Sequence, residues 1–191
     1  MKNLGMLGAS RDGDNSFETT VMQNIGTALA GAGKTVRVGC MTGQLESFAE
    51  SFLQAGGDLK VFLIPKQQQK SIDVCTRLGV PFEEVDRDNA RTLKLLRAKG
   101  WVSTYLSLGS IGETARGVTW NQDRKIRDKI LTPHFILARS DTNMNLMDAY
   151  RSAAFEGRAS SDLVQELFVP FRDGQELVDR IHQVEERAHR L

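Results

Sequence analysis

The stretch "TVRVGCMTGQLESFAESFLQAGGDLKVFLIP", Thr35–Pro65, indicates the fold most clearly because it holds one complete strand–turn–helix–strand unit. The apolar run "TVRVG" leads into the turn "CMTG". Apolar residues then recur at the i, i+3, i+4, i+7, i+8 spacing of a helix with one buried face: Leu45, Phe48, Ala49, Phe52 and Leu53. Gly56 and Gly57 end this helix, and "LKVFLI" follows as a second apolar run. The stretch therefore predicts two parallel strands joined by a helix.

The same order recurs along the rest of the chain. "LGML" precedes a polar turn and a helix that begins near Phe17 and ends at Gly33, which we expect to be a left-handed cap. "VPFEEV", "WVSTYLSL" and "HFILA" read as further strands between helices, and "FVPF" reads as an edge strand because Pro170 cannot donate a ladder hydrogen bond. Helices are expected for "SDLVQEL" and for the C-terminal "GQELVDRIHQVEERAH". This order predicts an α/β fold, a Rossmann-like parallel sheet with helices on both faces, as a single domain over residues 1–191.

Charge and composition narrow the classes of partner. The 25 basic and 24 acidic residues leave a net charge of +1, so no overall field attracts nucleic acid or anionic lipid. The two cysteines imply no disulfide framework, and the three histidines show no metal-ligand spacing. No apolar run approaches the about 20 residues that span a bilayer, and the N-terminal apolar run is too short for a signal peptide. We expect a cytoplasmic protein without metal or cofactor and without a nucleic-acid or membrane partner.

Three turns between a strand and a helix are candidates for ligand binding: Gly8–Ser16, Gly39–Glu46 and Gly109–Thr114. Glycine lets a backbone approach a ligand closely, and the following helix N-terminus offers free N–H groups to an anion. The carboxyl ends of parallel strands meet at one edge, so these turns predict a site for a small nucleotide or phosphate ligand. Neither GxGxxG nor GxxxxGK[ST] is present. The candidate ligand-binding residues are Gly8, Ser10, Arg11, Gly39, Thr42, Gly43, Glu46, Gly109, Ser110, Gly112 and Thr114.

Several segments together resemble one known family. "LGAS" looks like that family's first-strand turn, and "RVGCMTGQLESFAESFLQAGGDLKVFLIP" follows its second glycine-rich turn, helix and strand. "GVTWNQDRKIRDK" is similar to its "EVxTWxQLGxHxKP" stretch, and "LMDAYRSAAFEGRASSDLVQELFVPFRDGQELVDRI" to its C-terminal helices and final strand. On these segments the chain resembles the Lonely Guy (LOG) family of Rossmann-like proteins, long labelled as lysine decarboxylases. The resemblance runs nearly from end to end.

The resemblance implies an activity. LOG proteins hydrolyse the N-glycosidic bond of nucleoside monophosphates to free base and ribose 5-phosphate, and plant members activate cytokinins in this way. Their signature is PGGxGTxxE with an arginine on the preceding helix. Here "LGSIG", 108–112, replaces PGGxG, Glu113 stands at the threonine position and Arg116 at the glutamate position. Arg91 lies two residues earlier than the spacing of the family's arginine.

Three residues, Glu113, Arg91 and Glu46, leave alternatives open. Glu113 either turns away to accept N–H bonds from its own helix or serves as a displaced catalytic acid. Arg91 either reaches the site or is a solvated surface charge. Glu46 either places a favourable charge in the first turn of a helix or bonds a sugar hydroxyl or base.

The leading expectation is a nucleotide N-glycosidase with Glu113 and Arg91 as catalytic residues. The alternative is a binding protein that holds a nucleotide or pterin cofactor without cleaving it, as related molybdenum-cofactor carriers do. No lysine context supports a decarboxylase. We also expect a homodimer, because the segment Val118–Trp120 resembles the family's dimer-forming segment and Trp120 would anchor an interface. The alternative is that Trp120 packs in the core.

Overall fold

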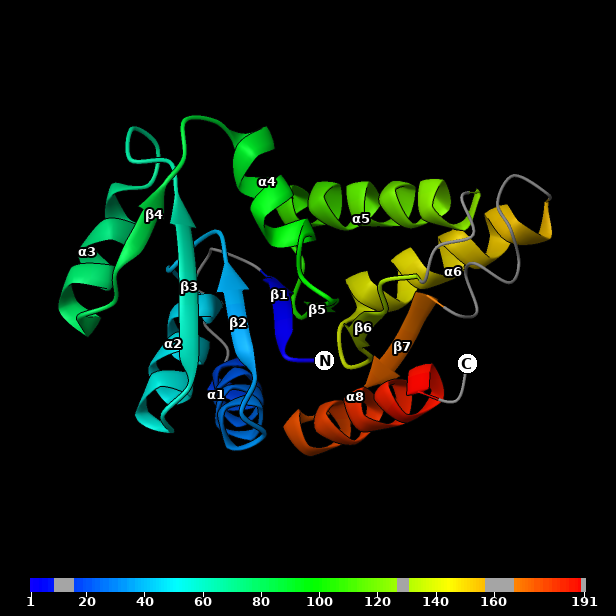
Figure 1. Cartoon of the computed structure of the whole chain (residues 1–191), viewed down its shortest axis with the longest axis horizontal. Coiled ribbons are helices and arrows are strands. Elements are labelled where there is room, and N and C mark those ends of the chain that lie inside the picture. The colour runs from blue at the N-terminus through cyan, green and yellow to red at the C-terminus, as the bar shows by residue number, and fades with distance from the viewer. Residues whose placement is uncertain (9–15, 127–130, 157–166, 190–191) are drawn as a thin grey trace.

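The computed structural model describes residues 1–8, 16–126, 131–156 and 167–189. Within these ranges seven strands form one sheet in which every neighbouring pair is parallel, in the order β4-β3-β2-β1-β5-β6-β7 (Figure 1). The strands are β1 (Asn3–Leu7), β2 (Thr35–Val38), β3 (Asp58–Leu63), β4 (Phe82–Glu84), β5 (Gly100–Ser103), β6 (His134–Leu137) and β7 (Phe168–Phe171). The parallel sheet expected from the sequence is confirmed, and β7 with Pro170 lies at its edge as predicted.

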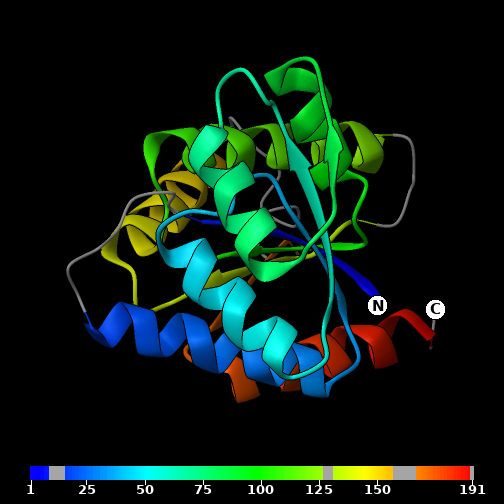
Figure 2. The ribbon, with the colours of Figure 1, turned by 90° about the vertical axis from the view of Figure 1, so that its left-hand side faces the viewer.

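Helices cover both faces of the sheet (Figures 1 and 2). They are α1 (Ser16–Gly31), α2 (Gln44–Gln54), α3 (Gln69–Leu78), α4 (Asp88–Leu96), α5 (Leu108–Ile126), α6 (Asp141–Phe155) and α8 (Gly174–His189). Side chains of α1, α2, α3 and α8 share one large buried cluster with alternate residues of the strands. The remaining strand residues pack against α4, α5 and α6 in three smaller clusters.

The alternation along each strand explains the two layers. On β1, Leu4 and Met6 join the large cluster, whereas Leu7 contacts the α4 side. On β5, Val102 belongs to the large cluster and Trp101 packs under the end of α4. Successive side chains of a strand point to opposite faces, so strands buried on both faces are apolar throughout. This explains why β1, β5 and β6 are mainly apolar in the sequence, whereas exposed charged residues interrupt β3 and β4.

Strand β1 lies at the point where the chain reverses its direction across the sheet. The chain passes from β1 through β2 and β3 to β4, and then returns through α4 to β5 on the other side of β1. In open parallel sheets, ligands bind outside the carboxyl ends of the strands at such a reversal. The fold therefore directs attention to the carboxyl ends of β1, β2 and β5.

Three boundaries can be compared with the sequence predictions. Gly33 ends the first helical unit with a φ of 64°, which confirms the left-handed cap. The turn expected over Gly109–Thr114 is wrong, because α5 already begins at Leu108 and these residues are helical. Ser107 provides the physical reason: its N–H bonds the Ser110 hydroxyl at 2.7 Å, a capping arrangement that starts the helix ahead of both glycines. The expected helix at 161–167 lies outside the described residues except for Leu167.

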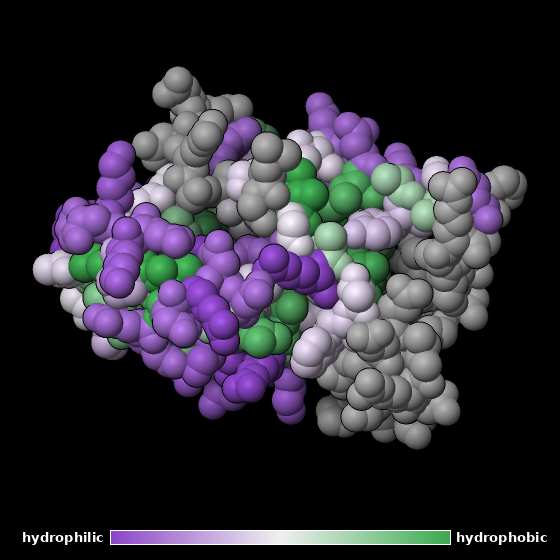
Figure 3. Space-filling model, turned by 90° about the horizontal axis from the view of Figure 1, so that it is seen from above, coloured by the Kyte–Doolittle hydropathy of each residue, from purple (hydrophilic) through white to green (hydrophobic). Residues whose placement is uncertain are grey.

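Seen from the side of α4 and α5, the surface consists of hydrophilic residues around small, separate apolar areas (Figure 3). Among the described residues the large apolar side chains that remain exposed are Phe17, Leu93 and Trp120. Trp120 is 37% exposed, so its packing in the core, one of the two alternatives, is not what the structure has.

A substitution at Gly26 tests the close approach of α1 to α2. A Cβ atom at this position would lie 2.7 Å from the carbonyl oxygen of Phe48, a backbone atom that cannot move aside freely. We expect Gly26→Ala to lower the free energy of unfolding by about 1–3 kcal/mol, as overpacking does. Gly31→Ala is the matched control, because a Cβ there meets nothing within 4 Å, and it should be neutral or stabilising. Urea denaturation of the two variants measures the difference, and equal stabilities would contradict it.

Candidate functional site

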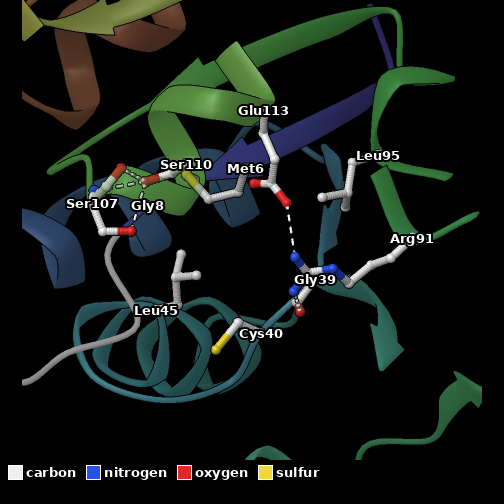
Figure 4. A pocket seen from close by; sticks show the side chains of 10 residues that line it. All are labelled: Met6, Gly8, Gly39, Cys40, Leu45, Arg91, Leu95, Ser107, Ser110 and Glu113. Carbon is white, nitrogen blue, oxygen red and sulfur yellow. Dashed lines mark hydrogen bonds and ion pairs between the residues drawn. The ribbon is translucent and has the colours of Figure 1, made fainter. Parts of the chain in front are cut away.

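A pocket opens at the carboxyl ends of β1 and β2, between the starts of α2 and α5 and the side of α4 (Figure 4). The space between its walls is about 400 Å³, including the part that opens to solvent. Its lining residues are Met6, Gly8, Gly39, Cys40, Leu45, Arg91, Leu95, Ser107, Ser110 and Glu113. A concave site with an apolar floor and a few converging polar groups is the usual form of a small-molecule site.

Neighbouring side chains pack closely against both glycines of the lining. A Cβ atom on Gly8 would lie 2.7 Å from the Thr104 hydroxyl oxygen, and one on Gly39 would lie 3.2 Å from Cδ of Arg91. The ends of β1 and β2 therefore allow neighbouring side chains to approach the backbone itself. This is what lets Arg91 reach the end of β2.

Arg91 crosses the pocket from α4 and is held by three acceptors. Its Nη1 donates to the carbonyl oxygen of Gly39 at 2.8 Å. Its Nη2 lies 3.0 Å from a carboxylate oxygen of Asp88 and 3.1 Å from Oε1 of Glu113. Its Nε is buried and has no hydrogen-bond partner in the described part of the chain. The side chain is only 19% exposed, so the alternative of a solvated surface charge does not apply to Arg91.

Glu113 faces Arg91 from α5, in the second turn of that helix rather than at its start. Its side chain is 14% exposed. Burial raises the pKa of Glu113 above its ordinary value, the positive charge of Arg91 opposes this, and Asp88 adds a smaller upward effect and Arg116 a smaller downward one. The alternative that Glu113 turns away to cap its own helix is wrong, because its carboxylate points across the pocket to Arg91 (Figure 4).

The start of α5 forms another wall of the pocket. At this end of the helix the N–H of Ile111 donates to the carbonyl of Ser107 at 2.8 Å. The N–H groups of residues 108–110 therefore belong to the free end of the helix, where anions are favoured. The hydroxyl of Ser110 accepts from the Ser107 N–H and lies 3.1 Å from the Ser107 carbonyl, so it fixes this end of the helix.

The structure brings some predicted residues together and leaves others apart. Gly8, Gly39, Ser110, Arg91 and Glu113 line the pocket. Gly109 lies in the first turn of α5, and Gly43 is the N-cap of α2 with a φ of 65°. Ser10 and Arg11 lie outside the described residues.

Four other candidates lie outside the pocket lining. Glu46 pairs with Arg77 of α3 at 2.5 Å, which favours the interpretation of a first-turn charge. Thr114 is fully buried, with its hydroxyl 3.4 Å from that of Ser103 on β5. Gly112 is exposed on α5, and the hydroxyl of Thr42 lies 3.2 Å from the Cys40 sulfur.

Sequence reasoning missed five lining residues: Met6, Cys40, Leu45, Leu95 and Ser107. Cys40 lies inside the predicted turn Gly39–Glu46, and Ser107 directly precedes α5, so their positions in or near the predicted turns were a usable signal. Leu45 also lies in the predicted turn Gly39–Glu46, but its place in an apolar helix stripe suggested a core residue, and Leu95 has no other signal in the sequence.

A buried polar cluster supports the wall formed by α5. His134 on β6 is fully buried, and its Nε2 lies 2.6 Å from the Ser103 hydroxyl. Burial lowers the pKa of His134 to about 3, so the imidazole is neutral at neutral pH. Asn143 of α6 donates to the carbonyls of Thr104 at 2.6 Å and Leu137 at 3.0 Å, which ties the ends of β5 and β6 together.

The described residues show neither a metal-binding cluster nor a membrane-spanning helix. They contain no group of three or more His, Cys, Asp or Glu side chains placed to hold a metal ion. None of the described helices is long and apolar enough to cross a membrane.

Comparison with known proteins finds likeness in structure alone. No protein-family model matches the sequence, and no curated protein matches it either. The molybdenum cofactor binding protein of the phototrophic bacterium Rippkaea orientalis superposes with a TM-score of 0.69 at 14% identity, over 96% of each chain. The structural-genomics target TM1055 also gives 0.69, at 20% identity over 96% of this chain and 99% of that chain.

A third structure is that of DNA processing protein A from Helicobacter pylori, described for its single-stranded DNA binding mode. It gives a TM-score of 0.62 at 12% identity, over 95% of this chain and 80% of that chain. Likeness at these identities shows a shared fold. The chain therefore has the Rossmann-like fold that the molybdenum cofactor binding protein and TM1055 also have.

Proposed function

We propose that the pocket binds a small molecule that carries a phosphate or another oxyanion, such as a nucleotide or a pterin-type cofactor, and holds it without cleaving it. The observation that carries this proposal is the Arg91 guanidinium. It lies in the pocket lining with one buried N–H donor that has no partner among the described residues. A guanidinium offers donors in a fixed fork that matches the oxygens of phosphate or carboxylate.

Two further features support anion binding. The free end of α5 adds N–H groups beside the pocket. A protein of the same fold binds the molybdenum cofactor, which is consistent with the proposed class of ligand. The near-neutral charge of the chain gives no support to nucleic-acid binding, although one protein of this fold binds single-stranded DNA.

The number and pairing of the acidic side chains at the pocket favour binding of the ligand over its hydrolysis. Glu113 is the one acidic side chain among the lining residues, and Arg91 neutralises it through an ion pair. The position of the family's signature glutamate holds Arg116, whose Nη1 lies 3.3 Å from the hydroxyl of Thr92. Hydrolysis of a glycosidic bond needs a carboxylate to stabilise positive charge on the sugar and another group to activate water.

Nucleotide N-glycosidase activity remains the second candidate, because one observation favours it. Burial raises the pKa of Glu113, which is the property of a carboxyl group that acts as a general acid. The homodimer expected from Val118–Trp120 also stays a proposal, supported by the partial exposure of Trp120.

The charge of Glu113 provides the experiment. A carboxylate about 4 Å from a phosphate costs roughly 1–4 kcal/mol, so Glu113→Gln should tighten binding of a nucleoside monophosphate by about five-fold to several hundred-fold. The corresponding nucleoside, which lacks the charge, should change little. Isothermal titration of both ligands measures this difference.

Glu46→Gln is the matched control, because Glu46 is held by Arg77 outside the pocket lining, and it should leave both affinities unchanged. If Glu113→Gln changes the affinities for the nucleotide and the nucleoside equally, this would contradict the proposal that the pocket binds the anion of the ligand. If the natural chain releases free base from the nucleotide and Glu113→Gln abolishes this release, the result would favour the N-glycosidase.

A further inference from the structure

The guanidinium of Arg91 is only partly used. Nη1 is fixed by the Gly39 carbonyl, and Nη2 is shared between one oxygen of Asp88 and one oxygen of Glu113. The Nε–H is buried and unpartnered among the described residues. An oxyanion with two suitably spaced oxygens can accept from Nε and Nη2 along the same edge of the guanidinium. Such a ligand would compete with Glu113 for Nη2.

A second arginine lies beside this pair. Arg116 follows Glu113 by three residues on α5, a spacing that brings two side chains to the same side of a helix. Its Nη1 approaches the hydroxyl of Thr92, the residue next to Arg91 on α4. The charges that act on Glu113 come from Arg91 and Asp88 on α4 and from Arg116 on α5, and both arginines oppose the larger rise of the Glu113 pKa that burial causes.

We propose that ligand binding exchanges the partner of Glu113: the oxyanion of the ligand takes the Nε and Nη2 edge of Arg91, and the Glu113 carboxylate moves to Arg116. In the structure the Glu113 carboxylate lies on Nη2, at the place that the ligand's anion would take. Asp88 stays on Nη2 and keeps the guanidinium oriented during the exchange. This inference rests on the proposed function and names the part of the ligand that is recognised, a phosphate monoester or a carboxylate.

The exchange is favoured because a displaced carboxylate would otherwise lie unpaired beside the new anion. Glu113 is mostly buried, so solvent screens this repulsion poorly. Arg116 is exposed and its neutral partner Thr92 holds it weakly, so it is available to accept the carboxylate. Arg116 is thus a positioning residue that sets affinity without touching the ligand.

A double-mutant cycle tests the exchange, with adenosine monophosphate and inorganic phosphate as probes. Arg116→Gln should weaken binding of each probe by about two- to ten-fold in the natural chain, as expected for coupled charges in one network. In the Glu113→Gln background the same substitution should have no effect, because no carboxylate needs a new partner. A merely structural role of the contact between Arg116 and Thr92 would weaken both backgrounds equally.

Arg97→Gln is the matched control, since Arg97 caps the far end of α4 away from the pocket lining, and it should leave the cycle unchanged. Equal effects of Arg116→Gln in the two backgrounds, or no effect in the natural chain, would overturn the exchange and leave the binding proposal standing. Failure of both probes to bind the natural chain and Glu113→Gln would overturn the binding proposal and the exchange together. Circular-dichroism melting of each variant separates these results from a loss of folding.

Discussion

Replacement of Arg91 by alanine is expected to weaken binding of a nucleoside monophosphate by about thirty-fold to several thousand-fold. Removal of one partner of a buried, hydrogen-bonded charge pair costs about 2–5 kcal/mol. Here the substitution removes the proposed anion receptor and also leaves the mostly buried carboxylate of Glu113 facing the ligand without its counter-charge. Titration calorimetry on the folded variant measures the effect.

Two further variants make this result specific. Arg87→Ala removes a 77% exposed arginine at the start of the same helix, and it should leave the affinity unchanged. The double variant Arg91→Gln with Glu113→Gln removes both members of the ion pair. Because neither charge is left unpaired in the pocket, we expect this variant to stay folded. It should still fail to bind the nucleotide tightly. Natural affinity in this double variant would contradict the role of Arg91.

Acid is expected to destabilise the folded chain through His134. The pKa of His134 is about 3 in the fold, against about 6.5 for an exposed histidine, so between these values the unfolded chain binds a proton that the folded chain does not. Stability therefore falls as the pH drops from about 6.5 towards 3, by about 1.4 kcal/mol per pH unit. At pH 4.5 this loss amounts to about 3 kcal/mol. Urea unfolding at a series of pH values measures it.

His134→Gln removes the titrating group and should flatten this part of the pH profile, whatever it does to stability at neutral pH. His182 is exposed on α8, so His182→Gln should keep the natural profile. If the two variants lose stability equally steeply with acid, the steep profile does not come from the buried imidazole.

Much of the fold could be predicted because strands buried on both faces are apolar throughout and each helix carries one apolar face. Leu45, Phe48 and Phe52 gave the position of α2, and Gly33 gave a helix end, since these patterns depend on neighbouring residues alone. The start of α5 could not be predicted in this way. The capping bond between Ser107 and Ser110 begins the helix, and the glycines at 109 and 112 suggested a loop instead.

The centre of the site was partly predictable. Gly8, Gly39 and Ser110 follow from the rule that turns at the carboxyl ends of parallel strands converge. The ion pair of Arg91 and Glu113 joins two helices whose separation across the pocket depends on the packing of α4 and α5 on the sheet. Sequence spacing contains no information about that distance. The complete burial of His134 could likewise not be predicted, because burial in a core is a property of the whole fold.

The most direct test is a measurement of what happens to a bound nucleotide over time. The natural chain is saturated with a nucleoside monophosphate, free ligand is removed, and the retained material is analysed by chromatography after hours at neutral pH. We expect about one nucleotide for each chain to be recovered intact, with Glu113→Gln retaining it longer. Accumulation of free base and ribose 5-phosphate beyond one equivalent would contradict binding without cleavage, and no retained nucleotide in either protein would contradict the site itself.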